Sequence, residues 1–459
     1  MAARDSIQLI HKTVHHKALT GPHRITPKQL EAMKGRLAKI IRRVEAERVA
    51  GDHRYRDLPY QRTMVRQVQA ACKKYKPRAD NLVVLGIGGS ALGNIALQQA
   101  LNPLTYNLLP KSKRKGPRLF VLDNVDPHLV ADTLGLLRGE LGRTVFNVIS
   151  KSGQTAETAA QFMIVRDLLY CKLGPTRAKR QIIVTTDPAK GTMRQIVDRE
   201  GYDSLAVPDG VGGRFSVLSA VGLFSAAMCN IDIAALLKGA ADMDKQVRSP
   251  VLSKNPAALL AAIHVLYTKR GKPIHVMMPY ANQLYGLADW FRQLWAESLG
   301  KRFSATGKKE VFAGPTPVKA LGTTDQHSQV QLYREGPNDK VVTFLEVERF
   351  GCDVKIPKAF GDVPAISYLG GAGLAKLLNA EKEATEKAMI ASRRPCLTVK
   401  FPRICPYAVG QFIYLYEAAT TLAGRLLGIN PYDQPAVELG KKITFHLMGR
   451  EGYERMPRE

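Results

Sequence analysis

Four short segments hold side chains suited to acid–base chemistry. Gln293 and Glu297 lie four residues apart in QLWAESLGK, which places both on one face of a helix beside tryptophans, where a carboxylate is a candidate general base. Arg214 follows two glycines in GGRFS, where a cation can meet developing negative charge. His327 lies in the polar segment GTTDQHSQ, and Lys441 lies in DQPAVELGKK. Taken singly, each of these residues is more often structural than catalytic.

A fifth segment, SKSGQTAET from Ser150 to Thr158, has the composition of a phosphate cradle. It follows an apolar run and precedes a helix, so unpaired backbone N–H groups should face the same point as the hydroxyls of Ser152 and Thr155. The simpler alternative is a hydroxyl that caps the helix, but capping needs only one of them. We therefore favour a phosphate site.

A glycine turn at Gly86-Ile-Gly-Gly89-Ser90 also follows an apolar run and opens a helix. Glycines let the backbone approach a ligand closely, so the turn could bind an anion or could only be a tight connection. The spacing is not G-x-G-x-x-G, and no acidic residue closes a second strand about 20 residues on. A dinucleotide site is therefore not expected.

The elements that must position these groups alternate between strand and helix. Apolar runs end at the two loops described above, at 81–86 and 144–149, and a third run covers 181–186. Continuous apolar runs of this kind are typical of strands buried on both faces of a parallel sheet. Further strands are expected at 273–278 and 341–347, and helices at 25–49 and 406–428. This order predicts an α/β fold.

Composition narrows the function classes. The 459 residues suit two to four soluble domains, with no signal peptide or transmembrane helix expected. Six cysteines lie far apart without a C-x-x-C pair, which argues against a zinc site or a disulfide framework and favours a reducing cytosol. The net charge of +27, with a basic run from Lys111 to Lys115, would suit a polyanion. Because no recognisable motif organises these charges, we expect neither a nucleic-acid nor a membrane partner.

The order and the residues of these segments closely resemble those of the glucose-6-phosphate isomerase (phosphoglucose isomerase) family, in its shorter bacterial form. The Ser/Thr loop alone resembles the sugar isomerase (SIS) superfamily, whereas GGRFSVLSAVGLF, QLWAESLGK, GTTDQHSQVQLYREGP and YDQPAVELGK are specific to the isomerase. The resemblance implies two SIS-type doubly wound parallel-sheet domains with helical N- and C-terminal arms. The expected boundaries are 1–70 for the N-terminal arm, 71–231 for the first domain, 232–272 for a helical connector, 273–430 for the second domain and 431–459 for the segment with the catalytic lysine.

The resemblance also implies roles in converting glucose 6-phosphate to fructose 6-phosphate, in glycolysis and gluconeogenesis. Glu297 would move the proton between C2 and C1, His327 and Lys441 would open the ring, and Arg214 would stabilise a cis-enediolate. The chemistry has no redox step, so no cofactor and no metal are expected. We expect a cytoplasmic protein, and the family is commonly a homodimer with His327 donated across the subunit interface. The implied substrate-binding residues are Gly89, Ser90, Ser150, Lys151, Ser152, Thr155, Gly213, Gln293 and Gln434.

One departure from the family's sequence pattern and two alternative functions remain to be considered. The family usually has glycine where this chain has Ala436, and alanine would cost stability if that position needs a positive φ. An aminosugar-phosphate isomerase of SIS type is one rival, although its glutamine-using form needs an N-terminal cysteine and residue 2 is alanine. A non-catalytic phosphosugar sensor is the other, but it would have no reason to keep Glu297, His327 and Lys441.

Overall fold

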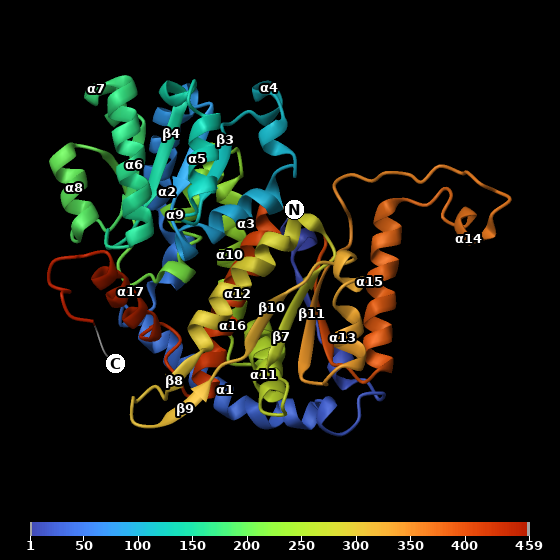
Figure 1. Cartoon of the computed structure of the whole chain (residues 1–459). Coiled ribbons are helices and arrows are strands. Elements are labelled where there is room, and N and C mark those ends of the chain that lie inside the picture. The colour runs from blue at the N-terminus through green and yellow to red at the C-terminus, as the bar shows by residue number, and fades with distance from the viewer. Residues whose placement is uncertain (1, 457–459) are drawn as a thin grey trace.

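The computed structural model describes residues 2–456 and contains two five-stranded sheets, one above the other in Figure 1. The first sheet has the order β3-β2-β4-β5-β6, and all neighbouring strands in it are parallel. The alternation of strand and helix therefore gives the predicted α/β unit. The strands are β2 (Asn81–Leu85), β3 (Arg118–Leu122), β4 (Thr144–Ile149), β5 (Ile182–Thr186) and β6 (Asp203–Ala206).

Helices cover both faces of the first sheet because its strands are apolar on both faces. In β2, Leu82 and Val84 pack into one core cluster, while Val83 and Leu85 pack into another. Successive side chains of a strand point to opposite faces, so a continuous apolar run needs cover on both sides. One face packs on α5 (Pro127–Leu136), α6 (Ala156–Leu173), α7 (Pro175–Lys179) and α8 (Thr192–Glu200), and the other on α2 (Arg62–Tyr75), α3 (Leu92–Leu101) and α9 (Ala220–Met228).

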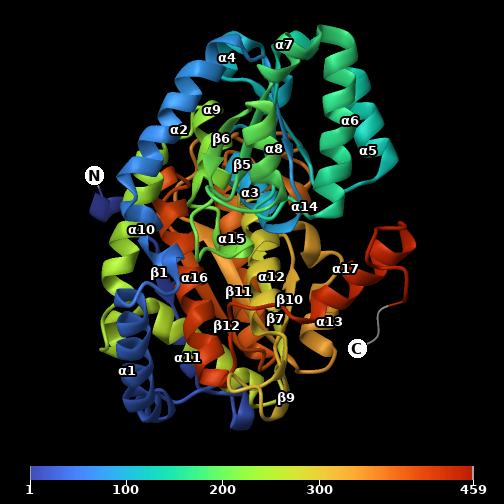
Figure 2. The ribbon, with the colours of Figure 1, turned by 90° about the vertical axis from the view of Figure 1, so that its left-hand side faces the viewer.

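The second sheet has the order β1-β12-β11-β7-β10 and is parallel except for β1, which pairs antiparallel with β12 at one edge. Helices again lie on both faces, as Figure 2 shows. The strands are β1 (Gln8–Ile10), β7 (Ile274–Pro279), β10 (Thr316–Lys319), β11 (Lys340–Val347) and β12 (Cys396–Phe401). Its helices are α12 (Tyr285–Leu299), α13 (Val330–Glu335) and α15 (Leu374–Ala391), and a separate hairpin pairs β8 (Lys301–Phe303) with β9 (Glu310–Ala313).

The central helix α16 (Pro406–Leu427) packs against α10 (Ile233–Val247) and α11 (Pro256–Thr268), which form the predicted helical connector. Proline at its first position and Gly428 at φ +76° just past its end set its limits, since only glycine adopts that backbone freely. The first long helix, α1 (Pro27–Val49), begins at a capping box formed by Thr26 and Gln29. These helices join the two sheets into one core.

The predicted strands and long helices agree with the structure to within about two residues at their ends, but half of the strands in the two sheets were missed. Strand β3 is only partly buried and begins with an arginine, and β6 has just four residues, so neither shows a long apolar run. Strand β1 adds a β element to an N-terminal segment expected to be helical. We keep the predicted domain boundaries as a proposal and add strand β1 to the N-terminal arm.

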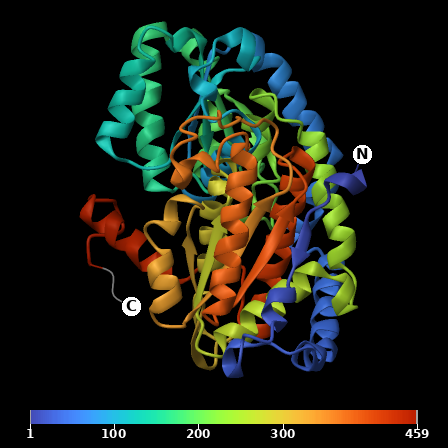
Figure 3. The same cartoon turned by 90° about the vertical axis from the view of Figure 1, so that its right-hand side faces the viewer.

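Two segments project from the body. The C-terminal helix α17 (Ala436–Leu447) buries none of its residues, and it stands apart from the core in Figures 2 and 3. The connection between β11 and α15 forms a long excursion with the short helix α14 (Pro364–Ser367), at the right of Figure 1. Among residues 2–456, no helix is both long and apolar enough to cross a membrane.

Candidate functional site

A buried arginine joins three parts of the chain. Arg214 lies in the short turn Gly213–Phe215 and is 3% exposed. Its guanidinium uses all three nitrogens as donors, the geometry in which arginine orients several acceptors at once. The acceptors are Ser298 Oγ at 2.6 Å, Glu297 Oε1 at 2.9 Å, Gln434 Oε1 at 2.9 Å, and the carbonyl oxygens of Pro431 at 2.7 Å and Asp433 at 3.2 Å.

Glu297 and Gln293 occupy neighbouring turns of α12, as their spacing predicted. Gln293 Nε2 donates to Glu297 Oε2 at 3.1 Å, while Gln293 Oε1 is buried without a hydrogen-bond partner among residues 2–456. One carboxylate oxygen therefore faces a guanidinium and the other faces an amide. The Glu297 side chain keeps 28% of its surface exposed, so a small ligand can reach it.

The tryptophans of α12 do not supply the contacts of this carboxylate. Trp295 is fully buried and donates from Nε1 to His275 Nδ1 at 2.9 Å, and Trp290 packs near Phe412. The immediate neighbour of the Glu297 carboxylate is instead the guanidinium of Arg214. Burial lowers the pKa of Arg214, and the Glu297 carboxylate opposes that change.

The glycine turn after β2 packs directly on this cluster. A Cβ atom on Gly89 would lie 2.3 Å from the carbonyl of Gly213, so only glycine fits between the two turns. Gly88 has φ +57°, and a Cβ there would lie 3.0 Å from Gln293 Nε2. The hydroxyl of the next residue, Ser90, has no hydrogen-bond partner in the described chain. The turn thus brings a free hydroxyl to the edge of the Arg214 cluster.

The Ser/Thr loop follows β4 at the same end of the first sheet. Ser150 Oγ accepts from the Gly153 backbone N–H at 3.1 Å, and Ser152 Oγ accepts from Gln154 N–H at 3.2 Å, so both hydroxyl protons stay available. Thr155 occupies the N-cap position of α6, but its side chain makes no capping hydrogen bond. The capping alternative therefore does not explain Thr155. Three donors and a helix N-terminus fit an anion.

A lysine links this loop to the arginine turn. Lys151 Nζ donates to the carbonyl of Val211 at 3.3 Å and lies 3.9 Å from Asp209. Val211 precedes Gly213 and Arg214 by only two or three residues. The Ser/Thr loop, the glycine turn and the Glu297 helix are thereby connected through one continuous segment.

His327 and Lys441 are not brought to this cluster by any contact in residues 2–456. His327 is exposed after a short turn that follows β10, and its imidazole has no hydrogen-bond partner there. Lys441 lies on α17, half-exposed, and donates to Glu438 at 2.7 Å on the same helix. Ala436 is the first residue of that helix and has no positive φ, so the departure from the family's glycine carries no backbone strain.

Sequence reasoning missed Lys301, which lies one turn beyond Glu297. Its Nζ donates to the Glu297 carbonyl at 2.7 Å and lies 3.8 Å from Asp433, with only 6% of the side chain exposed. Burial, followed by the nearby Arg214, lowers the pKa of Lys301 to about 8. The i, i+4 spacing from Glu297 was a signal that could have identified it.

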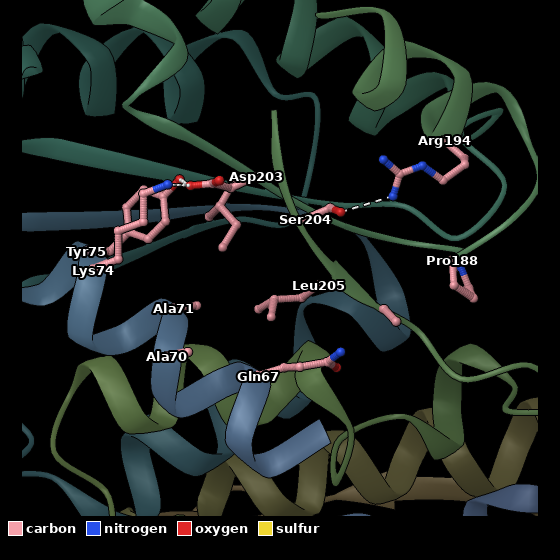
Figure 4. A pocket seen from close by; sticks show the side chains of 12 residues that line it. Gln67, Ala70, Ala71, Lys74, Tyr75, Pro188, Arg194, Asp203, Ser204 and Leu205 are labelled. Atoms are coloured by element: carbon pink, nitrogen blue, oxygen red, sulfur yellow. Dashed lines mark hydrogen bonds and ion pairs between the residues drawn. The ribbon is translucent and has the colours of Figure 1, made fainter. Parts of the chain in front are cut away.

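A separate hollow of about 420 Å³ lies between α2 and the edge strand β6, away from Arg214 (Figure 4). Its charged residues are paired with one another or with close neighbours, including Lys74 with Asp203 and Arg194 with Asp198. We assign the chemistry to the Arg214 cluster because its polar groups converge from three segments. Among residues 2–456, no group of three or more His, Cys, Asp or Glu side chains is placed to hold a metal ion.

The two sheets, each built mainly of parallel strands with helices on both faces, define the class of doubly wound α/β proteins. Residues 61–452 match the sequence model of the family described as Phosphoglucose isomerase. A glucose-6-phosphate isomerase of Carboxydothermus hydrogenoformans is 46% identical over 437 residues, covering 95% of this chain and 93% of that protein. The chain therefore belongs to the phosphoglucose isomerase family.

Two solved structures share the fold. A hypothetical protein from Thermus thermophilus has a TM-score of 0.85 at 36% identity, covering 96% of this chain and 99% of that one. A glucose-6-phosphate isomerase from Chlamydia trachomatis has a TM-score of 0.79 at 23% identity, covering 93% and 87% respectively. Because its sequence identity is only 23%, the second structure shows only that the two proteins share a fold.

Proposed function

We propose that this chain interconverts D-glucose 6-phosphate and D-fructose 6-phosphate through ring opening and a cis-enediolate. The Arg214–Glu297 pair carries the proposal, because it sets an accessible carboxylate beside a fixed, buried cation. Moving a hydrogen between C2 and C1 needs a base for a carbon-bound proton and a stabiliser for the enediolate charge. The reaction has no net oxidation, so these groups can perform it without a redox cofactor.

Glu297 is the proposed base. Its partly exposed carboxylate can take the proton from C2 of the open-chain aldose and return it to C1 of the enediolate. The hydroxyl proton on O2 passes to O1 in the same conversion, which leaves the ketose. Arg214 keeps a positive charge next to this path, in a site where burial limits the competition from water. Gln293 and Gln434 would contact the sugar hydroxyls from either side of this pair.

The phosphate is proposed to bind between the two loops of the first sheet. Ser150, Ser152 and Thr155 would donate to its oxygens, with Ser90 from the glycine turn and with the charge of Lys151 nearby. Gly89 and Gly213 would let the backbone approach the sugar. This placement is supported by the available hydroxyl protons and by the uncapped start of α6.

Ring opening is assigned to His327 and Lys441, with a second copy of the chain supplying His327. His327 is exposed and has no partner among residues 2–456, so it is free to enter a partner's site. The projecting segments support a homodimer, because they leave apolar side chains in water that a partner could cover. These side chains include Phe360 at 65% exposure, Tyr368 at 75%, Leu447 at 71% and Met448 at 79%. We place this dimer in the cytoplasm, where the reducing conditions suit the free cysteines.

A coupled assay that detects fructose 6-phosphate formed from glucose 6-phosphate tests this proposal, with glucosamine 6-phosphate as the comparison substrate. Turnover of glucose 6-phosphate supports it. Turnover of the aminosugar alone would favour the aminosugar-phosphate isomerase. Saturable binding of both sugars without turnover would favour the phosphosugar sensor.

A further inference from the structure

A second polar hollow lies at the amino-terminal end of the strands of the first sheet, opposite the end that carries the Ser/Thr loop. Its volume is about 370 Å³, and it opens at the amino ends of β2, β3 and β4. Four cations line it against two carboxylates, which leaves an excess of two positive charges. The cations are Lys111, Arg114, Arg118 and Arg143, and the carboxylates are Asp80 and Glu140.

Both carboxylates are already engaged. Asp80 pairs with Arg143 through one oxygen and accepts from Lys111 Nζ at 2.5 Å through the other. Arg118 Nη2 lies 2.8 Å from Glu140. Both oxygens of Asp80 are therefore occupied, while Glu140 uses only its Oε2 atom, which also accepts from Asn81. The two acids can balance only two of the four positive charges that line the hollow.

Arg114 is the cation without a counter-ion. It lies in the short helix α4 (Lys111–Arg114), is 9% exposed, and forms no ion pair with any described residue. Its Nε donates to the Leu109 carbonyl at 2.8 Å, which fixes the guanidinium in the wall, and its Nη1 has no hydrogen-bond partner in the described chain. A buried charge without a partner is costly, and a bound anion would compensate it.

Residues around the hollow add further positive charge. Lys113 and Lys115 are the chain neighbours of Arg114, and both are exposed and without ion pairs in the described chain, so they add positive charge close to the hollow. Leu108 also lines the hollow and is 84% exposed, so an apolar surface lies next to the cations. The combination suits an anion of high charge density that can carry an organic group.

This hollow is separate from the proposed sugar-phosphate site. Strand β4 runs from Thr144, next to Arg143, to Ile149, next to Ser150. Six residues of strand span roughly 20 Å at about 3.3 Å each. One sugar phosphate cannot occupy both ends of this strand.

We propose that this hollow is a binding site for a compact multivalent phosphate with two linked phosphoryl groups, either inorganic pyrophosphate or the tail of a nucleoside diphosphate. Arginine and lysine together supply the forked and point-charge donors that phosphoryl oxygens accept. A volume of 370 Å³ fits a small molecule rather than a polymer. The site is independent of the isomerase reaction and depends on none of the residues proposed for it.

Calorimetric titration with pyrophosphate tests this site, carried out with the sugar-phosphate site saturated by an equilibrium mixture of glucose and fructose 6-phosphates. We expect one remaining binding event per chain, weakened at least tenfold by the exposed double substitution Lys111→Gln/Arg143→Gln. The control Lys308→Gln/Lys309→Gln removes the same charge from an exposed hairpin and should bind like the parent. The KM for glucose 6-phosphate should not change in either variant.

Parallel titrations with ADP and orthophosphate separate the sources of the anion. ADP binding more tightly than pyrophosphate would assign the site to a nucleotide, and equal binding would assign it to the free anion. Absence of pyrophosphate binding to the parent would overturn the proposal. Equal weakening in the hairpin control, or orthophosphate binding as tightly as pyrophosphate, would also overturn it, because general charge would then explain the result.

Discussion

The Oε1 atom of Glu297 lies 2.9 Å from Nη1 of Arg214, although 83 residues separate the two in the chain. The same Nη1 lies 2.9 Å from Gln434 Oε1, so the arginine connects the proposed base to the C-terminal segment. A lysine could keep the charge but not these simultaneous contacts. The geometry of the arginine is therefore as important to the proposed function as its charge.

Replacing Arg214 by lysine should lower kcat/KM for glucose 6-phosphate by about 10²–10³, a range typical for loss of a donor that stabilises developing charge. Thermal unfolding should also occur at lower temperature, since the acceptors of the guanidinium all lie on other segments of the chain. Arg302→Lys, on the half-exposed side chain of β8, is the matched control and should change neither value appreciably. Retention of kcat/KM within threefold in Arg214→Lys would exclude the proposed role.

Removing the loop hydroxyls should weaken substrate binding more than turnover. Ser152→Ala and Thr155→Ala each delete a donor to a phosphate that is present in both ground and transition states, so KM should rise by about 10-fold or more while kcat changes little. Steady-state kinetics measure both parameters, with Ser304→Ala in an exposed turn as the control. A fall in kcat at unchanged KM would contradict phosphate binding by this loop.

Lys301 should make stability depend on pH. Burial lowers its pKa from 10.5 to about 8, so between these values the unfolded chain binds a proton that the folded chain has released. The cost of the buried charge is complete below pH 8 and disappears as pH rises toward 10.5. Relative to Lys301→Met, the parent's free energy of unfolding should therefore rise by about 2 kcal/mol between pH 7.5 and pH 10.

Urea unfolding of both proteins at the two pH values measures this difference, and groups common to both cancel in the comparison. Lys308→Met, at an exposed position, should show no pH-dependent difference from the parent. A constant gap between the parent and Lys301→Met across this range would show that Lys301 keeps an ordinary pKa.

Mixing two inactive variants tests whether His327 acts in the neighbouring subunit. If each site combines Glu297 of one chain with His327 of the other, a hybrid of Glu297→Gln and His327→Ala has one complete site and one doubly defective site. Random reassociation makes half of the dimers hybrids, so activity should return to roughly a quarter of the parent's. If both residues act within one chain, no hybrid has a complete site, and activity should stay at the level of the separate variants.

The sequence predicted the parts of the site that depend on local spacing. Gln293 and Glu297 lie four residues apart on a helix, so their contact follows from helical geometry. The end of β4 and the start of α6 likewise follow from an apolar run and a Ser/Gly loop. These relationships are fixed by residues close together in the chain.

Contacts across the chain were beyond local reasoning. The tryptophans suggested an apolar setting for Glu297, but Arg214 contacts its carboxylate from another segment. The Gly89–Gly213 contact depends on how two loops pack, which their glycines permit but do not specify. Lys301 was overlooked because its lowered pKa comes from burial and from Arg214, both products of tertiary packing.

The turnover of Glu297→Gln tests the proposed mechanism most directly. The amide keeps the size of the side chain, and its oxygen can still accept from Arg214, but it cannot accept a proton from carbon. We therefore expect kcat for glucose 6-phosphate to fall by about 10²–10⁴. Binding of the sugar phosphate and the thermal unfolding transition should stay close to the parent's, which would show an intact site. A variant that keeps kcat within tenfold of the parent's would contradict the assignment of Glu297 as the base.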